Sequence, residues 1–166
     1  MKKLTVAVIC LALLAAVAGC ATTGGSTAAP HVDGTLPDIL HKMYENLDPS
    51  VQLPFLMEAP LTHEGTAFNP SVSYFIGSND VPFKEGLVSE AAIGAQAYSV
   101  VLLRMESGAD INAAMNTIRT TVDPWKWICV GVDPSDVIVD NIGDLIILIM
   151  SDYSRQLHEA FRTLAV

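Results

Sequence analysis

The sequence predicts a single α+β domain in which a largely antiparallel sheet of about five strands packs against three helices, in the order α-β-β-β-α-β-β-α. Three segments repeat apolar residues at helical spacing, and the strand-like runs arrive in adjacent groups separated by single helices. The chain has 166 residues, of which roughly 147 follow a predicted leader, and this length suits one hydrophobic core. We therefore expect one domain over residues 35–166.

The first 19 residues have the pattern of a secretory signal peptide. Two lysines precede an apolar run that begins at Leu4 and is too short to span a bilayer as a permanent helix. The run ends in Val17-Ala18-Gly19-Cys20, which resembles a bacterial lipobox. This resemblance implies cleavage before Cys20 and acyl chains, such as palmitate, attached through its thiol. The alternatives are an ordinary signal peptide with an incidental cysteine, or a membrane-anchoring helix over residues 4–19.

Residues 20–34 form the predicted lipid anchor and tether. Beyond the cysteine they are small, turn-forming and almost uncharged, which is typical of a flexible linker. A linker of this length has a typical reach of roughly 20 Å. We expect the tether to clear the lipid headgroups and to hold the folded domain close to a membrane, outside the cytoplasm.

The first helix is predicted to begin at Thr35. Thr35-Leu36-Pro37-Asp38 combines a capping hydroxyl, a proline in the first turn and an acidic residue that can meet free backbone amides. An apolar stripe follows at helical spacing: Leu36, Ile39, Leu40, Met43, Tyr44 and Leu47. Asp48-Pro49 ends this helix, because helical geometry is disfavoured for the residue before a proline.

The middle of the chain is predicted to supply three strands. Residues 51–69 form a proline-interrupted loop, and a short strand is expected over Val72–Ile76. Two longer strands, Leu87–Ile93 and Ala97–Met105, are separated at Gly94. Within the last of them, Val100–Leu103 is apolar on both faces, which predicts a central strand covered on both sides.

The second half is predicted to contain a helix, a hairpin and a final helix. A capping pattern at Ser107-Gly108-Ala109-Asp110 precedes a second apolar stripe: Ile111, Ala114, Met115, Ile118 and Val122. Residues 125–130 are ambiguous between a short helix and a strand, and we favour a helical turn that leads into an extended segment. Val137–Val139 and Leu145–Met150 form the predicted hairpin, and Ser151 opens the last helix.

The charge balance argues against some classes of partner. The chain has 9 basic and 18 acidic residues, and loss of the two leader lysines leaves a net charge of −11 on the mature part. Such a surface repels nucleic acid and anionic lipid headgroups. We therefore expect no nucleic-acid binding.

Cysteine usage predicts that the domain has no intramolecular disulfide. Cys10 leaves with the leader, Cys20 carries the lipid, and Cys129 is the one cysteine left in the domain. Because Cys129 lies between Ile128 and Val130, we expect a buried, small apolar residue whose thiol stays protonated.

One stretch of the chain resembles a known family. The residues are Asp123-Pro124-Trp125-Lys126-Trp127-Ile128-Cys129-Val130, followed by Gly143-Asp144-Leu145-Ile146-Ile147. They resemble a family of small bacterial lipoproteins with a C-terminal domain of unknown function. The similarity runs from about Leu36 to Phe161 and takes in Glu90 and Ala97-Tyr98-Ser99. It implies a place in cell-envelope assembly or modification, and it brings no activity, cofactor or catalytic residue.

Two patterns suggest metal ligands, and each has a simpler explanation. His63-Glu64 begins like a zinc-protease helix, but Ala67 stands where the second histidine ligand would be needed. Asp136, Asp140 and Asp144 are candidate ligands for a hard cation such as calcium. Turn-forming aspartates that bond their own backbone explain the same cluster.

Three further residues are candidates for ligand binding. Trp125 and Trp127 could together line a groove for a sugar or a peptide, or the pair could be split between core and surface. Glu90 lies inside an apolar strand, where a carboxylate must face solvent, serve a site, or pair with a cation such as Arg104 or Lys126.

The sequence therefore predicts a membrane-anchored lipoprotein outside the cytoplasm, acting as a binding or accessory module of the bacterial cell envelope. Its expected partners are the membrane, through the lipid on Cys20, and an envelope protein or component. The absence of a nucleophile elbow, a phosphate-binding glycine loop and paired zinc-type cysteines favours a non-enzymatic role without catalytic residues or a cofactor. The alternatives are an envelope hydrolase or transferase, and a metal or small-ligand receptor.

Overall fold

The computed structural model describes residues 30–65 and 70–165 and contains one antiparallel five-stranded sheet. The strands are β1 (Leu56–Pro60), β2 (Phe83–Ala91), β3 (Ser99–Met105), β4 (Val137–Ile142) and β5 (Leu145–Met150). The helices are α1 (Leu36–Glu45), α2 (Val72–Ile76), α3 (Ile111–Thr121) and α4 (Ser154–Arg162). These elements confirm the predicted α+β class. The predicted signal peptide, the lipobox and Cys20 lie outside the described residues.

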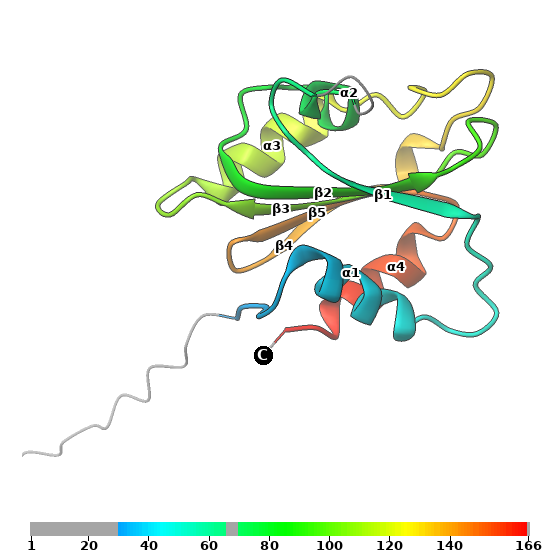
Figure 1. The fold of residues 1–166 in the computed structure, drawn as a ribbon, viewed down its shortest axis with the longest axis horizontal. Helices are drawn as coiled ribbons and strands as arrows, with labels where there is room; N and C mark the ends of the chain where they lie inside the picture. The colour runs from blue at the N-terminus through cyan, green and yellow to red at the C-terminus, as the bar shows by residue number, and fades with distance from the viewer. Residues whose placement is uncertain (1–29, 66–69, 166) are drawn as a thin grey trace, which may run out of the picture.

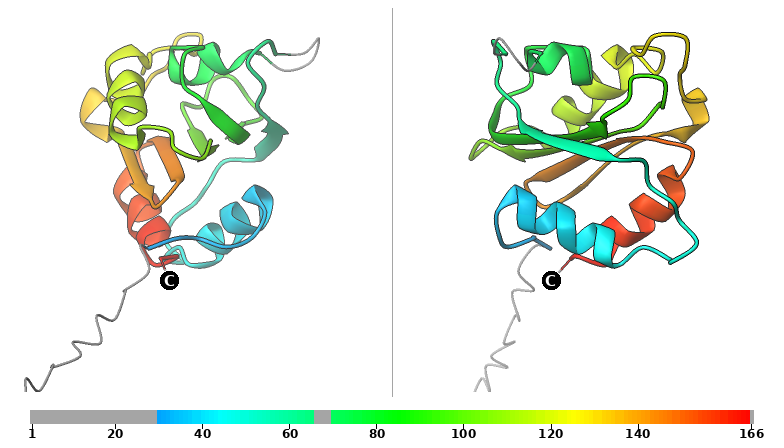
Figure 2. Two further views of the ribbon diagram at one scale, coloured as in Figure 1. Left: turned by 90° about the vertical axis from the view of Figure 1, so that its left-hand side faces the viewer. Right: turned by 45° about the vertical axis from the view of Figure 1, so that its right-hand side comes forward.

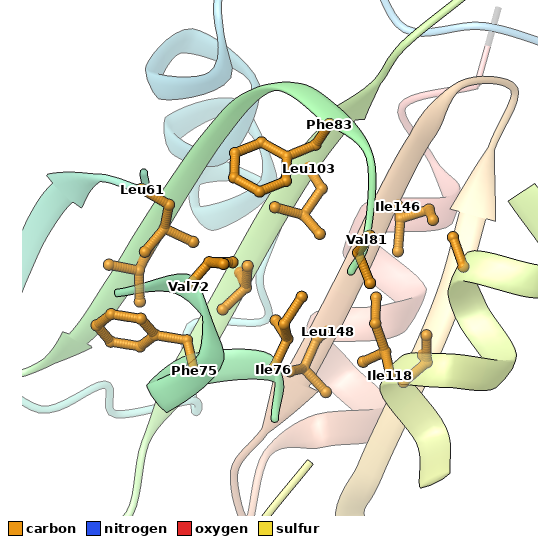
Figure 3. Packing of buried hydrophobic residues seen from close by; sticks show 14 of the residues in the cluster. Leu61, Val72, Phe75, Ile76, Val81, Phe83, Leu103, Ile118, Ile146 and Leu148 are labelled. Carbon is orange, nitrogen blue, oxygen red and sulfur yellow. The ribbon is translucent and has the colours of Figure 1, made fainter. Parts of the chain in front are cut away.

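The helices cover both faces of the sheet, whose strand order is β1-β2-β3-β5-β4. Helices α1 and α4 lie on one face, and α2 and α3 lie on the other (Figure 1). On the second face, Phe75 and Ile76 of α2 and Ile118 of α3 point toward the apolar side chains of the sheet (Figure 3). The central strands β3 and β5 are apolar on both faces and almost fully buried, as predicted for Val100–Leu103.

Helix α1 forms where its capping pattern predicts it. The Thr35 hydroxyl accepts a hydrogen bond from the Asp38 amide at 3.3 Å, and Pro37 lies in the first turn. The predicted stripe supplies the buried residues of this helix: Leu36, Ile39, Leu40 and Met43. The helix ends at Glu45, shortly before Asp48-Pro49.

The first strand lies elsewhere than predicted. Val72–Ile76 is the short helix α2 rather than a strand, because Val72, Phe75 and Ile76 bury one helical face against the sheet. The strand is instead β1, inside the segment predicted to be a loop. A proline is tolerated at its end because β1 is an edge strand, where one row of backbone amides is not needed for the sheet.

Residues 125–130 form turns and bends, so neither a short helix nor a strand is present there. The prediction that Cys129 is buried was also wrong, because the residue is exposed and has a positive φ of 65°. At this point the backbone turns outward, which leaves Ile128 and Cys129 in solvent while Trp127 packs into the core. The last helix begins at Ser154, three residues later than predicted.

The chain enters the domain at one end of the sheet. The Pro30 carbonyl packs closely against Gly143 in the β4–β5 turn, and Arg104 donates hydrogen bonds to the carbonyls of Val32 and Gly34 at 3.0 and 3.3 Å. Segments 51–55, 92–98, 124–131 and 151–153 gather at the opposite end (Figures 1 and 2). We call this the loop end.

Candidate functional site

Glu90 and Lys126 form a buried ion pair at the loop end. The Lys126 ammonium donates to Glu90 Oε1, and it lies 3.3 Å from Ser99 Oγ on the neighbouring strand. The Lys126 side chain is only 3% exposed, and that of Glu90 is 20% exposed. Of the two cations considered for Glu90, the structure therefore selects Lys126, whereas Arg104 pairs with Asp144.

Three aromatic rings surround the Lys126 ammonium. The ring centroids of Tyr74, Phe75 and Trp127 lie 4.8, 4.6 and 4.9 Å from Nζ, within the range of cation–π attraction. Burial lowers the pKa of Lys126, and the Glu90 carboxylate opposes this effect. The pair fastens the 124–131 segment to β2 and β3. Both charged groups are occupied by each other, which suits a structural role better than a catalytic one.

The two tryptophans are split between core and surface. Trp127 is buried among the residues of the α2–α3 face, whereas Trp125 is 63% exposed. The Trp125 ring covers Gly131 so closely that a Cβ atom there would lie 2.5 Å from the ring. A shared groove between the two side chains is therefore not present, and Trp125 alone presents its ring to solvent.

Large apolar side chains are exposed at or beside the loop end. Among the described residues they are Phe55, Met57, Tyr74, Ile93, Trp125 and Ile128, which we call the apolar surface. Phe55 and Ile128 are 79% and 83% exposed. Contiguous groups of this kind on a folded domain mark interaction sites, whereas scattered single residues do not.

The Glu90–Lys126 pair connects several parts of this surface. Met57 is the register partner of Glu90, so the two side chains share a sheet face. The Phe55 carbonyl accepts a hydrogen bond from the Ala92 amide at 2.8 Å, next to Ile93. Tyr74 lies over the Lys126 ammonium, and Trp125 and Ile128 belong to the segment that Lys126 fastens. Positions distant in the sequence are thus brought to one end of the molecule.

A hollow of about 510 Å³ lies beside the apolar surface. It is lined by parts of all four loop-end segments, among them Gln52, Tyr98, Gly131 and Asp152. The Trp125 ring packs against Gly131, which places this exposed tryptophan at the rim of the hollow. Among the described residues that line this hollow there is neither Glu90 nor a histidine.

The three candidate metal ligands, Asp136, Asp140 and Asp144, each contact different side chains. Asp136 accepts from Ser154 Oγ at 3.4 Å, and Asp144 pairs with Arg104 at 3.2 Å. Asp140 lies 2.7 Å from His158 Nε2 and 3.3 Å from Arg162. Burial raises the pKa of Asp140, but His158, the Asn141 amide and Arg162 outweigh burial and lower it. Within residues 30–65 and 70–165, no three acidic, histidine or cysteine side chains are grouped to hold a metal ion.

The His63-Glu64 pair lies in a bend rather than on a helix. The His63 ring stacks on Phe83 with the two centroids 4.4 Å apart, which accounts for its position without a metal. Ala67 lies outside the described residues. The arrangement therefore has none of the helical ligand spacing of a zinc protease.

Sequence reasoning identified only Trp125 of the apolar surface as a candidate site residue. The other five exposed side chains were not considered as a site: Phe55, Met57, Tyr74, Ile93 and Ile128. The available signal was the alternation of Phe55 and Met57 between two prolines, which is typical of an edge strand with one apolar face.

No family of proteins, no curated protein and no solved structure matches this chain. The resemblance to small envelope lipoproteins therefore stays a prediction. Any function has to be inferred from the geometry of the described residues. No helix among them is long and apolar enough to cross a membrane.

Proposed function

We propose that this protein is a lipid-anchored binding module of the bacterial cell envelope, located outside the cytoplasm, which holds a protein partner against its apolar surface. The observation that carries this proposal is the gathering of six exposed large apolar side chains at or beside the loop end. Aromatic residues and methionine are enriched in the centres of protein interfaces. Four of the six are of these types: Phe55, Met57, Tyr74 and Trp125.

The position of the tether supports a protein partner rather than a lipid surface. The first described residues pack against the β4–β5 turn, so the apolar surface lies at the other end of the sheet from the predicted anchor. The mature part carries a net charge of −11, which opposes close approach to anionic headgroups. A partner can therefore reach the apolar surface while the chain is held through its other end.

Site-specific photocrosslinking in intact cells tests this proposal. A photoreactive phenylalanine analogue replaces Phe55 or Trp125 in the full chain, and a control variant carries it at exposed Asn116 on α3. We expect Phe55 and Trp125 to give the same discrete crosslinked protein and Asn116 to give none. Crosslinks to lipid alone, or equal crosslinking from all three positions, would contradict the proposal.

The hollow at the loop end favours a second candidate, a small-ligand receptor. It could hold one sugar unit or one peptide side chain next to the Trp125 ring. A thermal-shift screen against envelope sugars and peptidoglycan fragments tests this role, because a ligand at a hundred times its dissociation constant adds about 2.7 kcal/mol to stability. A shift that disappears in Trp125→Ala would support the receptor, and no shift with any of these compounds would contradict it.

A further inference from the structure

The hydrogen-bonding pattern of β1 leaves one row of its backbone groups facing outward. The Phe55 carbonyl accepts a hydrogen bond from the Ala92 amide, and the Leu61 amide donates one to the Gly86 carbonyl. The backbone N–H and C=O groups of the odd-numbered residues of β1 therefore point toward β2. The N–H and C=O groups of Leu56 and Glu58 consequently point away from the sheet. Within the part of the chain that the structure describes, these four groups have no hydrogen-bond partner. Figure 2 shows β1 at the outer edge of the sheet.

At the opposite edge of the sheet, several outward backbone groups of β4 have hydrogen-bond partners. The Arg119 guanidinium donates to the outward carbonyl of Val139 at 2.6 Å, and Arg162 donates to that of Asn141 at 2.9 Å. The Val137 amide donates to the Pro134 carbonyl in the turn before β4. Side chains and local turns thus occupy much of the β4 edge, which prevents strand addition there. Among residues 30–65 and 70–165, no side chain or turn hydrogen-bonds the outward backbone groups of Leu56 and Glu58 on the β1 edge.

The side chains next to the β1 edge indicate which kind of strand fits. Phe55 and Met57 project toward the α2–α3 side and would contact alternate side chains of an added strand. Glu58 projects to the other side, where its carboxylate lies 3.0 Å from His41 on α1. An added strand with apolar residues on the first side and basic residues on the second complements both.

We propose that the partner contributes an extended segment of alternating apolar and basic residues, which pairs with Leu56 and Glu58 as a sixth strand at the β1 edge. This inference rests on the proposed function and specifies how the partner is recognised. Backbone pairing supplies affinity, while Met57 and Glu58 select the side chains on the two faces. The four outward groups of Leu56 and Glu58 set the length of the pairing at three residues of β1.

A proline probe separates backbone pairing from side-chain contact. Glu58→Pro removes an outward N–H without removing a hydrogen bond to β2, and the matched variant Glu58→Gln keeps that N–H. The purified full chain in detergent micelles is titrated with a nine-residue peptide of alternating valine and lysine, labelled for fluorescence anisotropy. We expect Glu58→Gln to weaken binding by the loss of its carboxylate charge alone, and Glu58→Pro to weaken binding at least tenfold further, because it also removes the outward N–H. A peptide methylated on its internal backbone nitrogens should not bind.

Hydrogen exchange on the unsubstituted chain gives a readout that does not depend on the folding of a variant. The amides of Leu56 and Glu58 should exchange rapidly in the free protein and slow at least tenfold when the peptide is bound. The Met57 amide faces β2 and should be protected in both states. Binding without protection of Leu56 and Glu58, or no binding up to about 1 mM peptide, would overturn the inference. Crosslinking from Phe55 and Trp125 would still report separately on the proposed function.

Discussion

A single buried lysine, Lys126, determines how the loop end is held together. Its ammonium is within reach of one carboxylate, one hydroxyl and three aromatic rings, so it replaces most of its lost hydration with protein groups. Glu90 gains its counter-ion from a segment 36 residues away. The sequence left three alternatives for Glu90, which could face solvent, serve a site or pair with a cation, and it offered two cations, Lys126 and Arg104. Only the path of the backbone decides between Lys126 and Arg104.

Removing the Lys126 charge should destabilise the protein through the carboxylate that it leaves behind. We expect Lys126→Met to lower the free energy of unfolding by about 3–5 kcal/mol, because it leaves the Glu90 carboxylate largely buried without its counter-ion. Chemical denaturation measures this change. The double variant Lys126→Met/Glu90→Gln should recover part of the loss. Equal losses in the single and double variants would show that the unpaired Glu90 charge is not the cause.

Two tyrosines between α1 and the sheet should make stability sensitive to alkaline pH. The Tyr98 hydroxyl donates to Tyr44 at 3.0 Å, and burial raises the pKa of both groups, that of Tyr44 from 10.0 to about 12. Between these pH values the unfolded chain has lost the Tyr44 proton while the folded protein keeps it. The free energy of unfolding therefore falls as pH rises through this window, by up to about 3 kcal/mol.

Tyr44→Phe removes this proton and provides the test. Unfolding by denaturant at several pH values from 8 to 12 should give a shallower loss of stability for the variant than for the parent protein. Tyr98 still contributes in the variant, so some slope should persist. Identical slopes in the two proteins would contradict the assignment, and the difference between them at pH 8 measures the cost of the lost hydroxyl alone.

At the scale of elements, the errors of the sequence prediction have one physical origin. β1 and α2 contain five residues each, too few for a periodic pattern to separate helix from strand. Val72–Ile76 is rich in strand-forming residues, but the positions that must be buried lie on one helical face. The longer elements α1, α3, β3 and β5 show several full periods, and their types were predicted correctly.

Helix α2 depends on a glycine at its C-terminal end. Gly77 has a φ of 81°, and a Cβ atom there would lie 2.0 Å from the Thr121 carbonyl oxygen on α3. Thr121 in turn donates a hydrogen bond from its hydroxyl to the Ile76 carbonyl at 2.9 Å. We expect Gly77→Ala to cost more than about 2 kcal/mol, since it combines backbone strain with a contact that forces α2 and α3 apart.

Gly108→Ala is the matched control for this prediction. Gly108 has nearly the same φ, 82°, but open space where the Cβ atom would lie. It should therefore cost only the strain of a left-handed conformation, about 1 kcal/mol. Thermal unfolding of the two variants separates strain from contact, and equal losses would rule out a role for the close approach to Thr121.

For the whole molecule, the sequence predicted the layers better than the surface. Long apolar strands must be covered on both faces, so the helices on either side of β3 and β5 followed from composition. Exposure of Ile93 and Ile128 could not be deduced in the same way, because apolar residues in short irregular segments are buried or exposed according to how the backbone turns. The exposed position of Cys129 has the same cause.

The attachment of the whole protein to a membrane is predicted to depend on Cys20 alone. Acyl chains contribute about 0.8 kcal/mol per buried methylene, so two or three chains hold a protein without help from its surface. The acidic mature part offers no electrostatic attraction to anionic lipids. We therefore expect Cys20→Ala to appear as a released protein or as an unprocessed precursor, which cell fractionation and intact-mass measurement distinguish. Cys10→Ala, inside the leader, should be processed and lipidated normally, and an unchanged lipidated membrane form of Cys20→Ala would refute the anchor.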